Sequence, residues 1–213
     1  MTSSARASPE ARLLSGLLAL KLDTALAAPL LRYLGELVLW SKAYNLTAVR
    51  DPAEIVTRHL LDSLVLLPHL REDPLLDAGS GAGLPAVPLA IARPQLRVTA
   101  LDSSAKKCRF LRQVKRVLKL DNLEVAEERA EAHRPAAPYG QVVSRAFAAL
   151  GGFLASTGPL GAPQGQWLAM KGKLAAAELK DLPAGFRIVD TPRLQVPGLA
   201  EERHLILVSR VPA

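Results

Sequence analysis

A glycine-rich segment that follows a short apolar run constrains the fold of this chain more than any other feature. Residues 75–77 are predicted to form a strand, and the sequence Asp-Ala-Gly-Ser-Gly-Ala-Gly occupies positions 77–83. Glycine lets the backbone turn sharply and approach a ligand closely. A helical pattern begins at Leu84. Because ligands of open α/β sheets bind beyond the carboxyl ends of the strands, the loop predicts a ligand site there.

From Pro74 onward, short apolar runs alternate with helical patterns. Strands are predicted at residues 75–77, 97–102, 123–126, 141–145, 166–170, 186–190 and 204–210, and helices at 84–92, 104–118, 149–160 and 174–181. This alternation predicts an α/β fold with a mostly parallel sheet and helices on both faces. The last two strands have no helical pattern between them, so we expect them to be antiparallel at a sheet edge.

The first 70 residues are predicted to be helical. An amphipathic helix capped near Ser8-Pro9 explains the first apolar stretch better than a signal peptide, because Glu10, Lys21 and Asp23 interrupt it. Further helices are expected at 24–40 and from 51–52 to about 67. We therefore expect a helical segment, residues 1–70, packed on a ligand-binding domain, residues 71–213.

The spacing of the loop glycines distinguishes between cofactors. Positions 79, 81 and 83 give G-x-G-x-G, whereas a dinucleotide site has G-x-G-x-x-G, and Leu84 stands where its third glycine would be. Asp77 can receive the ammonium group of a methionine moiety but would repel a pyrophosphate. Asp102, at the end of the second predicted strand, can accept hydrogen bonds from ribose hydroxyls in either kind of site. This set is typical of class I methyltransferases and predicts S-adenosylmethionine rather than NAD or a ligand-free turn.

Charge suggests a polyanionic partner. The net charge is +7 and the pI is near 9.9, which fits nucleic acid but does not require it. The predicted helix at 104–118 has cations and no acidic residue between positions 103 and 120. Such a face contacts phosphates or is simply solvated. Its cations are Lys106, Lys107, Arg109, Arg112, Lys115, Arg116 and Lys119.

Several classes of site are disfavoured. Cys108 is the only cysteine, so neither an internal disulfide nor a cysteine metal cluster can form, and its apolar position predicts a core residue rather than a nucleophile. A cytoplasmic protein without a metal site or a membrane span is expected. No Asn-Pro-Pro-Tyr segment follows the fourth predicted strand, which argues against methylation of a base amino group. Aromatic content of only 4% argues against a small-molecule methyltransferase.

An ordered set of short segments lies between about residues 30 and 210. The segments are Trp40, Asn45-Leu46-Thr47, Arg58-His59-Leu60-Leu61-Asp62-Ser63-Leu64, positions 77–85, Pro88-Leu89-Ala90-Ile91, Leu101-Asp102-Ser103, Lys106-Lys107, Phe110-Leu111, Arg129-Ala130-Glu131, Ser144-Arg145-Ala146, Lys171-Gly172, Val196-Pro197-Gly198-Leu199 and Arg203-His204. This set resembles the RsmG family (glucose-inhibited division protein B), whose members are bacterial guanine-N7 methyltransferases of small-subunit ribosomal RNA. Leu84 and Ala86 depart from the Phe and Gly usual in the family.

The resemblance implies a seven-stranded class I (Rossmann-like) methyltransferase that methylates N7 of a guanine in 16S ribosomal RNA. The cofactor-binding residues that it implies are Asp77, Gly79, Ser80, Gly81, Gly83, Leu84, Asp102, Ser103, Ala130, Glu131 and Arg145. Arg145 is expected between the cofactor and the base, as a positioning residue. No general base is expected, since N7 attacks with a free lone pair. Candidate RNA-binding residues are Asn45, Arg58, His59, Lys106, Arg109, Lys171 and Arg203.

Other functions stay open at this stage. They are a small-molecule or other-RNA class I methyltransferase, and a non-catalytic RNA-binding protein of the same fold. The expected partner is small-subunit ribosomal RNA or the small ribosomal subunit, and the protein is expected to be a monomer. Of the histidines, His59 is expected near the site and His133 on the surface.

Overall fold

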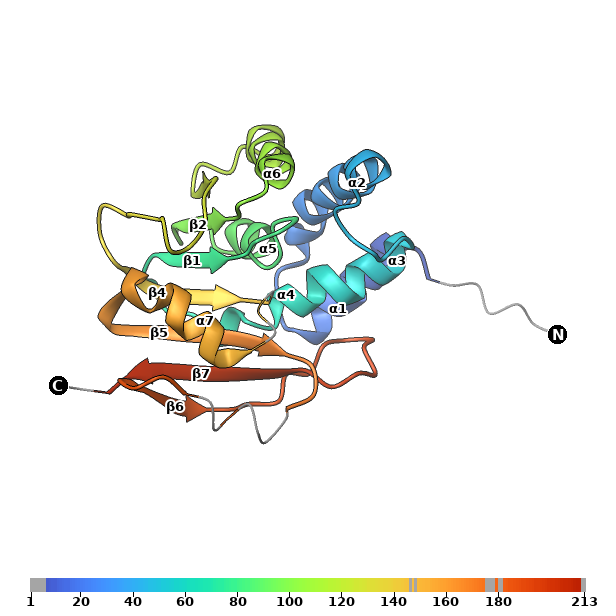
Figure 1. The fold of residues 1–213 in the computed structure, drawn as a ribbon. Coiled ribbons are helices and arrows are strands. Elements are labelled where there is room, and N and C mark those ends of the chain that lie inside the picture. The colour runs from blue at the N-terminus through green and yellow to red at the C-terminus, as the bar shows by residue number, and fades with distance from the viewer. Residues whose placement is uncertain (1–6, 146, 148, 175–178, 180–181, 212–213) are drawn as a thin grey trace.

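The strands form one seven-stranded sheet in the order β3-β2-β1-β4-β5-β7-β6 (Figure 1). The computed structural model describes residues 7–145, 147, 149–174, 179 and 182–211. All seven predicted strands are confirmed, with β4 and β5 beginning earlier than expected. Their bounds are β1 Leu75–Ala78, β2 Val98–Leu101, β3 Leu123–Ala126, β4 Tyr139–Ser144, β5 Gly161–Lys171, β6 Phe186–Asp190 and β7 His204–Arg210.

Strands β1 to β5 are parallel, and β7 runs antiparallel to both β5 and β6. This confirms the mostly parallel sheet and the antiparallel edge pair. The chain leaves β1 towards β2 on one side, and β4 lies on the other side of β1. The carboxyl ends of β1, β2 and β4 therefore meet at the point where strand order reverses, which is the usual ligand position in open α/β sheets.

The helices between the strands largely match expectation, with shorter bounds. They are α5 Ala86–Ala92, α6 Ala105–Leu118 and α7 Leu150–Thr157. Helix α5 begins two residues later than predicted, since residues 81–85 still belong to the turn. The helix predicted at 149–160 ends at Thr157 and continues as a 3-10 turn, η4 Gly158–Leu160, in which Pro159 has no N–H to donate. Most of the helix predicted at 174–181 falls outside the described residues.

The N-terminal part is helical, as predicted. Helix α1 (Pro9–Ala19) is capped by Ser8, whose hydroxyl accepts a hydrogen bond from the Ala11 N–H at 3.1 Å. Turn η1 (Thr24–Leu26) leads into α2 (Ala27–Tyr44). Helix α3 (Pro52–Ile55), a π-helical turn η2 (Val56–Leu61) and α4 (Asp62–Leu64) then follow without a break, and η3 (Leu67–His69) precedes the sheet. π-Helical turns often occur at functional sites.

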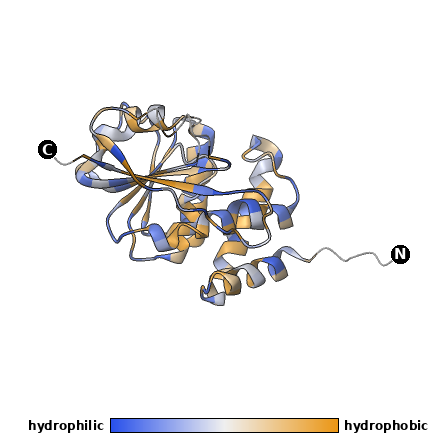
Figure 2. Ribbon diagram, turned by 90° about the horizontal axis from the view of Figure 1, so that it is seen from below, coloured by the Kyte–Doolittle hydropathy of each residue, from blue (hydrophilic) through white to orange (hydrophobic). Residues whose placement is uncertain are grey.

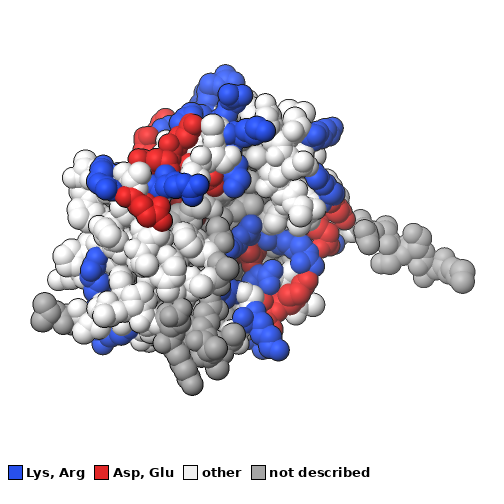
Figure 3. Space-filling model, viewed as in Figure 1, with Lys and Arg blue, Asp and Glu red and all other residues white. Residues whose placement is uncertain are grey.

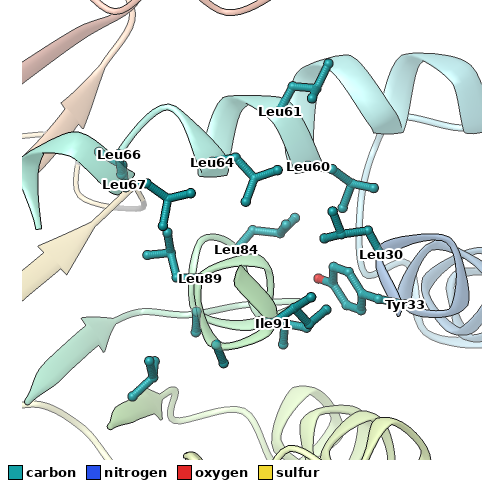
Figure 4. Packing of buried hydrophobic residues seen from close by; sticks show 14 of the residues in the cluster. Leu30, Tyr33, Leu60, Leu61, Leu64, Leu66, Leu67, Leu84, Leu89 and Ile91 are labelled. Atoms are coloured by element: carbon teal, nitrogen blue, oxygen red, sulfur yellow. The ribbon is translucent and has the colours of Figure 1, made fainter. Parts of the chain in front are cut away.

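Two apolar cores lie on opposite faces of the sheet. The smaller core includes Phe153 and Leu154 of α7. The larger one joins the N-terminal helices to α5, α6 and the strands, and Figure 4 shows Leu30, Tyr33, Leu60 and Leu64 converging on α5. Hydrophobic residues line the strands and the inner sides of the helices (Figure 2). The N-terminal helices and the sheet therefore share one hydrophobic core, with no separate core on either side of residue 70. The division into a helical segment and a ligand-binding domain near residue 70 stays a prediction.

Candidate functional site

The glycine loop needs its glycines for two different physical reasons. Gly79, Gly81 and Gly83 all have positive φ, at 73°, 62° and 89°. A Cβ at Gly83 would lie 2.6 Å from Val87 Cγ2 and 2.7 Å from Leu111 Cδ2, so this glycine permits close packing of the loop on α5 and α6. The nearest atom to a Cβ at Gly81 would be 3.9 Å away. Gly81 is therefore required for its backbone conformation alone.

Asp77 on β1 is completely buried beneath the loop. Its Oδ2 accepts hydrogen bonds from the Ser80 hydroxyl at 2.6 Å and from the Ala86 N–H at 3.1 Å, which fixes the loop and the start of α5. Its Oδ1 has no partner among the described residues. Burial raises the pKa of Asp77 to about 6, against the lowering effect of these hydrogen bonds and of Arg145. The unpartnered oxygen suits an ammonium group or a water molecule that carries one.

Asp102 follows β2 and connects that strand to the glycine loop. Its Oδ2 accepts from the Gly81 N–H at 2.9 Å and from Lys107 Nζ at 3.3 Å, and its Oδ1 accepts from the Ser104 N–H at 2.9 Å. Carboxylate oxygens have further acceptor capacity, so ribose hydroxyls can join these donors. Ser103 beside it is exposed. Lys107 was not predicted as a site residue, because it reads as one of many cations on its helix.

A cavity of about 230 Å³ opens at the glycine loop, and we call it the loop cavity. It contains five of the predicted cofactor residues together with residues from the N-terminal segment. Its lining is Leu46, Thr47, His59, Gly79, Ser80, Gly81, Ala82, Leu84, Lys107 and Arg145. The structure therefore brings the strand-four tip and the helical turn η2 to the same place as the loop.

Ala130 and Glu131 lie in a turn after β3. Ala130 packs against the smaller core, and Glu131 is exposed. Neither lines the loop cavity, but β3 is the neighbour of β2, so their turn is on the same side of the sheet as Asp102. Their proposed contact with adenine stays a prediction.

A second cavity, of about 380 Å³, shares a wall with the first. We call it the arginine cavity. It is lined by Val49, Arg58, His59, Asp62, Arg145, Met170, Lys171, Gly172 and Arg203, and His59 and Arg145 line both cavities. Lys and Arg side chains gather on this part of the surface, with acidic side chains between them (Figure 3). Four predicted RNA-binding residues and Arg145 thus surround one hollow.

His59 is held in a single neutral tautomer in the shared wall. Its Nδ1 lies 2.8 Å from the Arg58 carbonyl oxygen, which can only accept, so Nδ1 carries the proton. Its Nε2, 2.7 Å from Thr47 Oγ1, then accepts from the Thr47 hydroxyl. Burial, followed by the charge of Arg145, lowers the pKa of His59 to about 4. The ring is therefore uncharged at neutral pH.

Asp62 stands at the end of the π-helical turn and is 2% exposed. Its Oδ2 accepts from Arg145 Nη1 at 3.0 Å, and its Oδ1 accepts from Arg203 Nε at 2.9 Å. Asp62 belongs to one of the segments that carry the family resemblance but was not predicted as a site residue. A signal was present, since a carboxylate within the run Leu60-Leu61-Asp62-Ser63-Leu64 requires a partner if that run is buried.

The predicted RNA-binding cations that line the arginine cavity already have hydrogen-bond partners within the protein. Arg58 Nε donates to Glu54 at 3.0 Å, and its Nη2 contacts Glu201 at 2.5 Å. Lys171 Nζ donates to the Phe147 carbonyl at 2.9 Å. A phosphate would have to share or replace these acceptors.

Asn45 lies outside both cavities. It ends α2 in a left-handed conformation, with φ of 49°, and its Oδ1 accepts from Arg50 Nη2 at 2.8 Å. These contacts give Asn45 a helix-capping role, which asparagine fills well because it tolerates positive φ. Its predicted contact with RNA stays a prediction.

The cationic helix α6 is partly neutralised by acids from other elements. Arg112 pairs with Glu127 at 2.6 Å, and Lys115 pairs with Glu124 at 3.1 Å. Within the described part of the chain, no ion pair involves Lys106 or Arg109, which are both exposed. The uncompensated positive charge on α6 is therefore smaller than the sequence alone suggests. Among the cations of this helix, Lys106 and Arg109 are exposed and are not neutralised by an ion pair within the described residues.

The prediction that His133 lies on the surface was wrong. His133 is 8% exposed, and its ring contacts Glu128 at 2.7 Å and the Tyr139 hydroxyl at 2.9 Å. The turn after β3 folds back over β4, which the local sequence pattern does not reveal.

The described residues contain neither a cluster of metal ligands nor a membrane-spanning helix. No group of three or more His, Cys, Asp or Glu side chains is arranged to hold a metal ion. None of the described helices combines the length and hydropathy that a membrane crossing needs.

Comparison with known proteins gives one family. The family model GidB, described as rRNA small subunit methyltransferase G, matches residues 27–206. A curated relative named ribosomal RNA small subunit methyltransferase G from Xanthomonas campestris pv. campestris (strain B100) is 54% identical over 200 residues, 94% of each chain. The protein of the same name from Stenotrophomonas maltophilia (strain K279a) is 51% identical over 203 residues, which are 95% of this chain and 96% of that one.

Solved structures share the fold at low identity. A glycopeptide N-methyltransferase, MtfA, complexed with S-adenosyl-L-homocysteine, matches with a TM-score of 0.58 and 14% identity over 72% of this chain and 87% of that one. TrmN from Thermus thermophilus matches with a TM-score of 0.56 and 19% identity, over 73% of this chain and 53% of that one, so this chain spans about half of TrmN. These matches confirm the α/β fold of class I methyltransferases.

Proposed function

The chain belongs to the GidB family of small-subunit rRNA methyltransferases G, and we propose on this premise that it transfers a methyl group from S-adenosylmethionine to N7 of a guanine in 16S ribosomal RNA. The observation that carries the assignment within the fold is the pair of cavities that share His59 and Arg145 as a wall. One cavity suits the methyl donor and the other suits the acceptor nucleotide.

The carboxylates beside the glycine loop supply the acceptors that the cofactor needs. Asp77 offers its unpartnered Oδ1 to the ammonium group, directly or through water, and Asp102 receives the ribose hydroxyls. Leu84 is an apolar wall of the loop cavity. Ser103, Ala130 and Glu131 lie outside that cavity and are proposed to face the ribose and adenine of the cofactor. The bound cofactor supplies an electrophilic methyl group on a sulfonium.

The acceptor side requires alignment more than acid–base chemistry. Guanine N7 has a free lone pair and loses no proton on methylation, so no residue has to act as a base. Neutral His59 agrees with this, because its Nε2 already accepts from Thr47 and its Nδ1 already donates to a carbonyl. Arg145 is proposed to position the base against the donor, and most of the rate enhancement would come from holding the reacting atoms in line.

RNA binding is proposed along a cationic path beside the two cavities. Arg58, Lys171 and Arg203 rim the arginine cavity, and Lys106 and Arg109 extend the path over α6. Phosphate contacts of this kind provide affinity, while the target base has to leave its stack to reach the cavity.

The remaining proposals concern organisation. Residues 1–70 would form the wall opposite the glycine loop, and residues 71–213 would bind the cofactor. We propose a monomer that needs no metal and works in the cytoplasm on ribosomal RNA or the small ribosomal subunit.

The test is incubation of the purified protein with tritiated S-adenosylmethionine and small ribosomal subunits from a strain that lacks the enzyme. Labelled RNA is then cleaved with borohydride and aniline, which cut at N7-methylguanine. A single cut in 16S RNA is the expected result. Cofactor binding without RNA labelling would favour a small-molecule or other-RNA substrate, and no cofactor binding would overturn the assignment.

A further inference from the structure

Three distant parts of the chain meet at Asp62. The carboxylate comes from the end of the π-helical turn, Arg145 follows β4, and Arg203 precedes β7. Its two oxygens each accept from a different arginine, at 3.0 Å and 2.9 Å. All three residues line the arginine cavity, and the arginine side chains are 26% and 21% exposed while Asp62 is 2% exposed.

Each arginine keeps donors that the protein does not use fully. Arg145 donates through Nη1, and its Nη2 lies 3.5 Å from His59 Nδ1, which is itself a donor. Arg203 donates through Nε to Asp62 and through Nη1 to the Glu202 carbonyl. Because a guanidinium has five N–H groups in a fixed fork, fixing one edge fixes the direction of the others.

We propose that Asp62 is a positioning residue for methyl transfer, which holds Arg145 and Arg203 side by side so that their free N–H groups bind the carbonyl and phosphate oxygens of the acceptor nucleotide in the arginine cavity. The inference rests on the proposed function, since it places an RNA nucleotide there. Asp62 itself does not contact the base.

Because Asp62 is buried, its ion pairs with the two arginines are only weakly screened by solvent. Glu54 also pairs with two arginines, Arg12 and Arg58, but its side chain is 40% exposed, so solvent screens those pairs. Asp62 is shielded from water, and the loss of its charge would leave two neighbouring guanidinium groups to repel each other. The two arginines would then adopt other positions, and the acceptor would lose its alignment.

The first test is Asp62→Asn, assayed by single-turnover transfer to small ribosomal subunits at saturating cofactor. The rate is expected to fall roughly 10- to 100-fold, as for a misplaced positioning group. The Kd for S-adenosylmethionine is expected to change much less than the transfer rate, because Asp62 and Arg203 lie outside the loop cavity and of the three residues only Arg145 lines it. Glu124→Gln is the control, since it removes a carboxylate paired with Lys115 outside both cavities. A rate for Asp62→Asn within twofold of wild type would overturn the inference.

A second variant, Arg203→Lys, tests the same geometry without removing the buried carboxylate. It keeps the positive charge but replaces the planar fork with a point charge. The expected loss is about tenfold or more in rate with unchanged cofactor affinity, and an unchanged rate would overturn the inference even if Asp62→Asn fails to fold.

A thermodynamic cycle separates positioning from general stability. If Asp62 acts through Arg203, the combined variant Asp62→Asn/Arg203→Lys loses much less than the product of the single effects. Fully multiplicative losses would contradict the inference. Wild-type protein that labels no small-subunit RNA would overturn the proposed function together with this inference. Labelling by wild type and an equal rate for Asp62→Asn would overturn the inference alone.

Discussion

Tyr33 on α2 donates a hydrogen bond of 2.6 Å to the carbonyl oxygen of Ala82 in the glycine loop. The ring lies among Leu30, Leu60 and Ile91 in Figure 4, and the whole residue is buried. Burial raises the pKa of the Tyr33 hydroxyl far above its usual value, so it remains a donor at every accessible pH. A helix before the sheet therefore fixes one carbonyl of the cofactor loop.

Replacement of Tyr33 by Phe is expected to leave the Ala82 carbonyl buried without a partner. The free energy of unfolding should fall by about 1 to 2 kcal/mol, which lowers the Tm by a few degrees at this chain length. The Kd for S-adenosylmethionine should rise roughly two- to tenfold. Calorimetry of unfolding and of binding measures both. Tyr44→Phe is the control, because Tyr44 stacks on Trp40 at the end of the same helix. Equal behaviour of the two variants would contradict the proposed coupling.

Alanine at Gly83 and at Gly81 should have unequal effects. Both substitutions place a side chain at positive φ, which costs about 1 kcal/mol or more. At Gly83 the new Cβ would also overlap Val87 and Leu111, which adds about 1 to 3 kcal/mol of overpacking. Denaturant unfolding should therefore rank Gly83→Ala clearly below Gly81→Ala in stability. The reverse ranking would show that the loop does not pack as the structure has it.

The pH dependence of cofactor binding should follow Asp77. Its pKa is raised to about 6 by burial, and only the ionised form attracts an ammonium group. The ammonium group remains protonated below neutral pH. Affinity should therefore be about tenfold weaker at pH 5 than at pH 7. Titration calorimetry of wild type and Asp77→Asn tests this, and the variant should bind weakly with a flat profile between these values. A flat wild-type profile would remove Asp77 from the ammonium site.

The same shift predicts a stability trend for the cofactor-free protein. A carboxyl group whose pKa is raised in the folded state holds its proton where the unfolded chain releases it. The contribution of Asp77 to stability is therefore complete below about pH 4 and is lost as pH rises through about 6. Denaturant unfolding at pH 4 and at pH 7 measures this loss as a decrease in the free energy of unfolding. The decrease should be smaller in Asp77→Asn, because asparagine does not ionise.

Local sequence patterns predicted the elements of the fold well. The strands could be predicted because apolar runs of three to seven residues alternate with helical periodicity, and the loop because glycine spacing reports backbone conformation directly. The π-helical turn η2 was missed, because it forms within a stretch whose periodicity reads as an ordinary helix. Its consequence is the placement of Arg58, His59 and Asp62 around the two cavities.

The parts of the site that could not be predicted from the sequence are ion pairs between residues that lie far apart along the chain. Asp62 meets Arg145 and Arg203 across 83 and 141 positions, and Arg58 meets Glu201 across 143. Which charges neutralise each other depends on how the strands are ordered, and no local pattern contains that information. The acids that compensate Arg112 and Lys115 come from β3 and the turn after it for the same reason.

Helix α6 allows the proposed RNA path to be tested within one element. Lys106 is exposed and has no ion pair within the described residues, whereas Lys115 pairs with Glu124 at 3.1 Å. A lysine that neutralises a phosphate contributes about 0.7 to 0.9 to the slope of log K against log salt concentration. Lys106→Ala should therefore lower the slope by about that amount.

Lys115→Ala is the matched control, with the same charge removed from the same helix, and it should change the slope much less because Glu124 already compensates Lys115. Binding of labelled small-subunit RNA at several salt concentrations gives both slopes. Equal reductions would mean that α6 acts through net charge alone. A reduction for Lys115→Ala only would move the RNA path away from the end of the helix that lies next to Asp102 and the glycine loop.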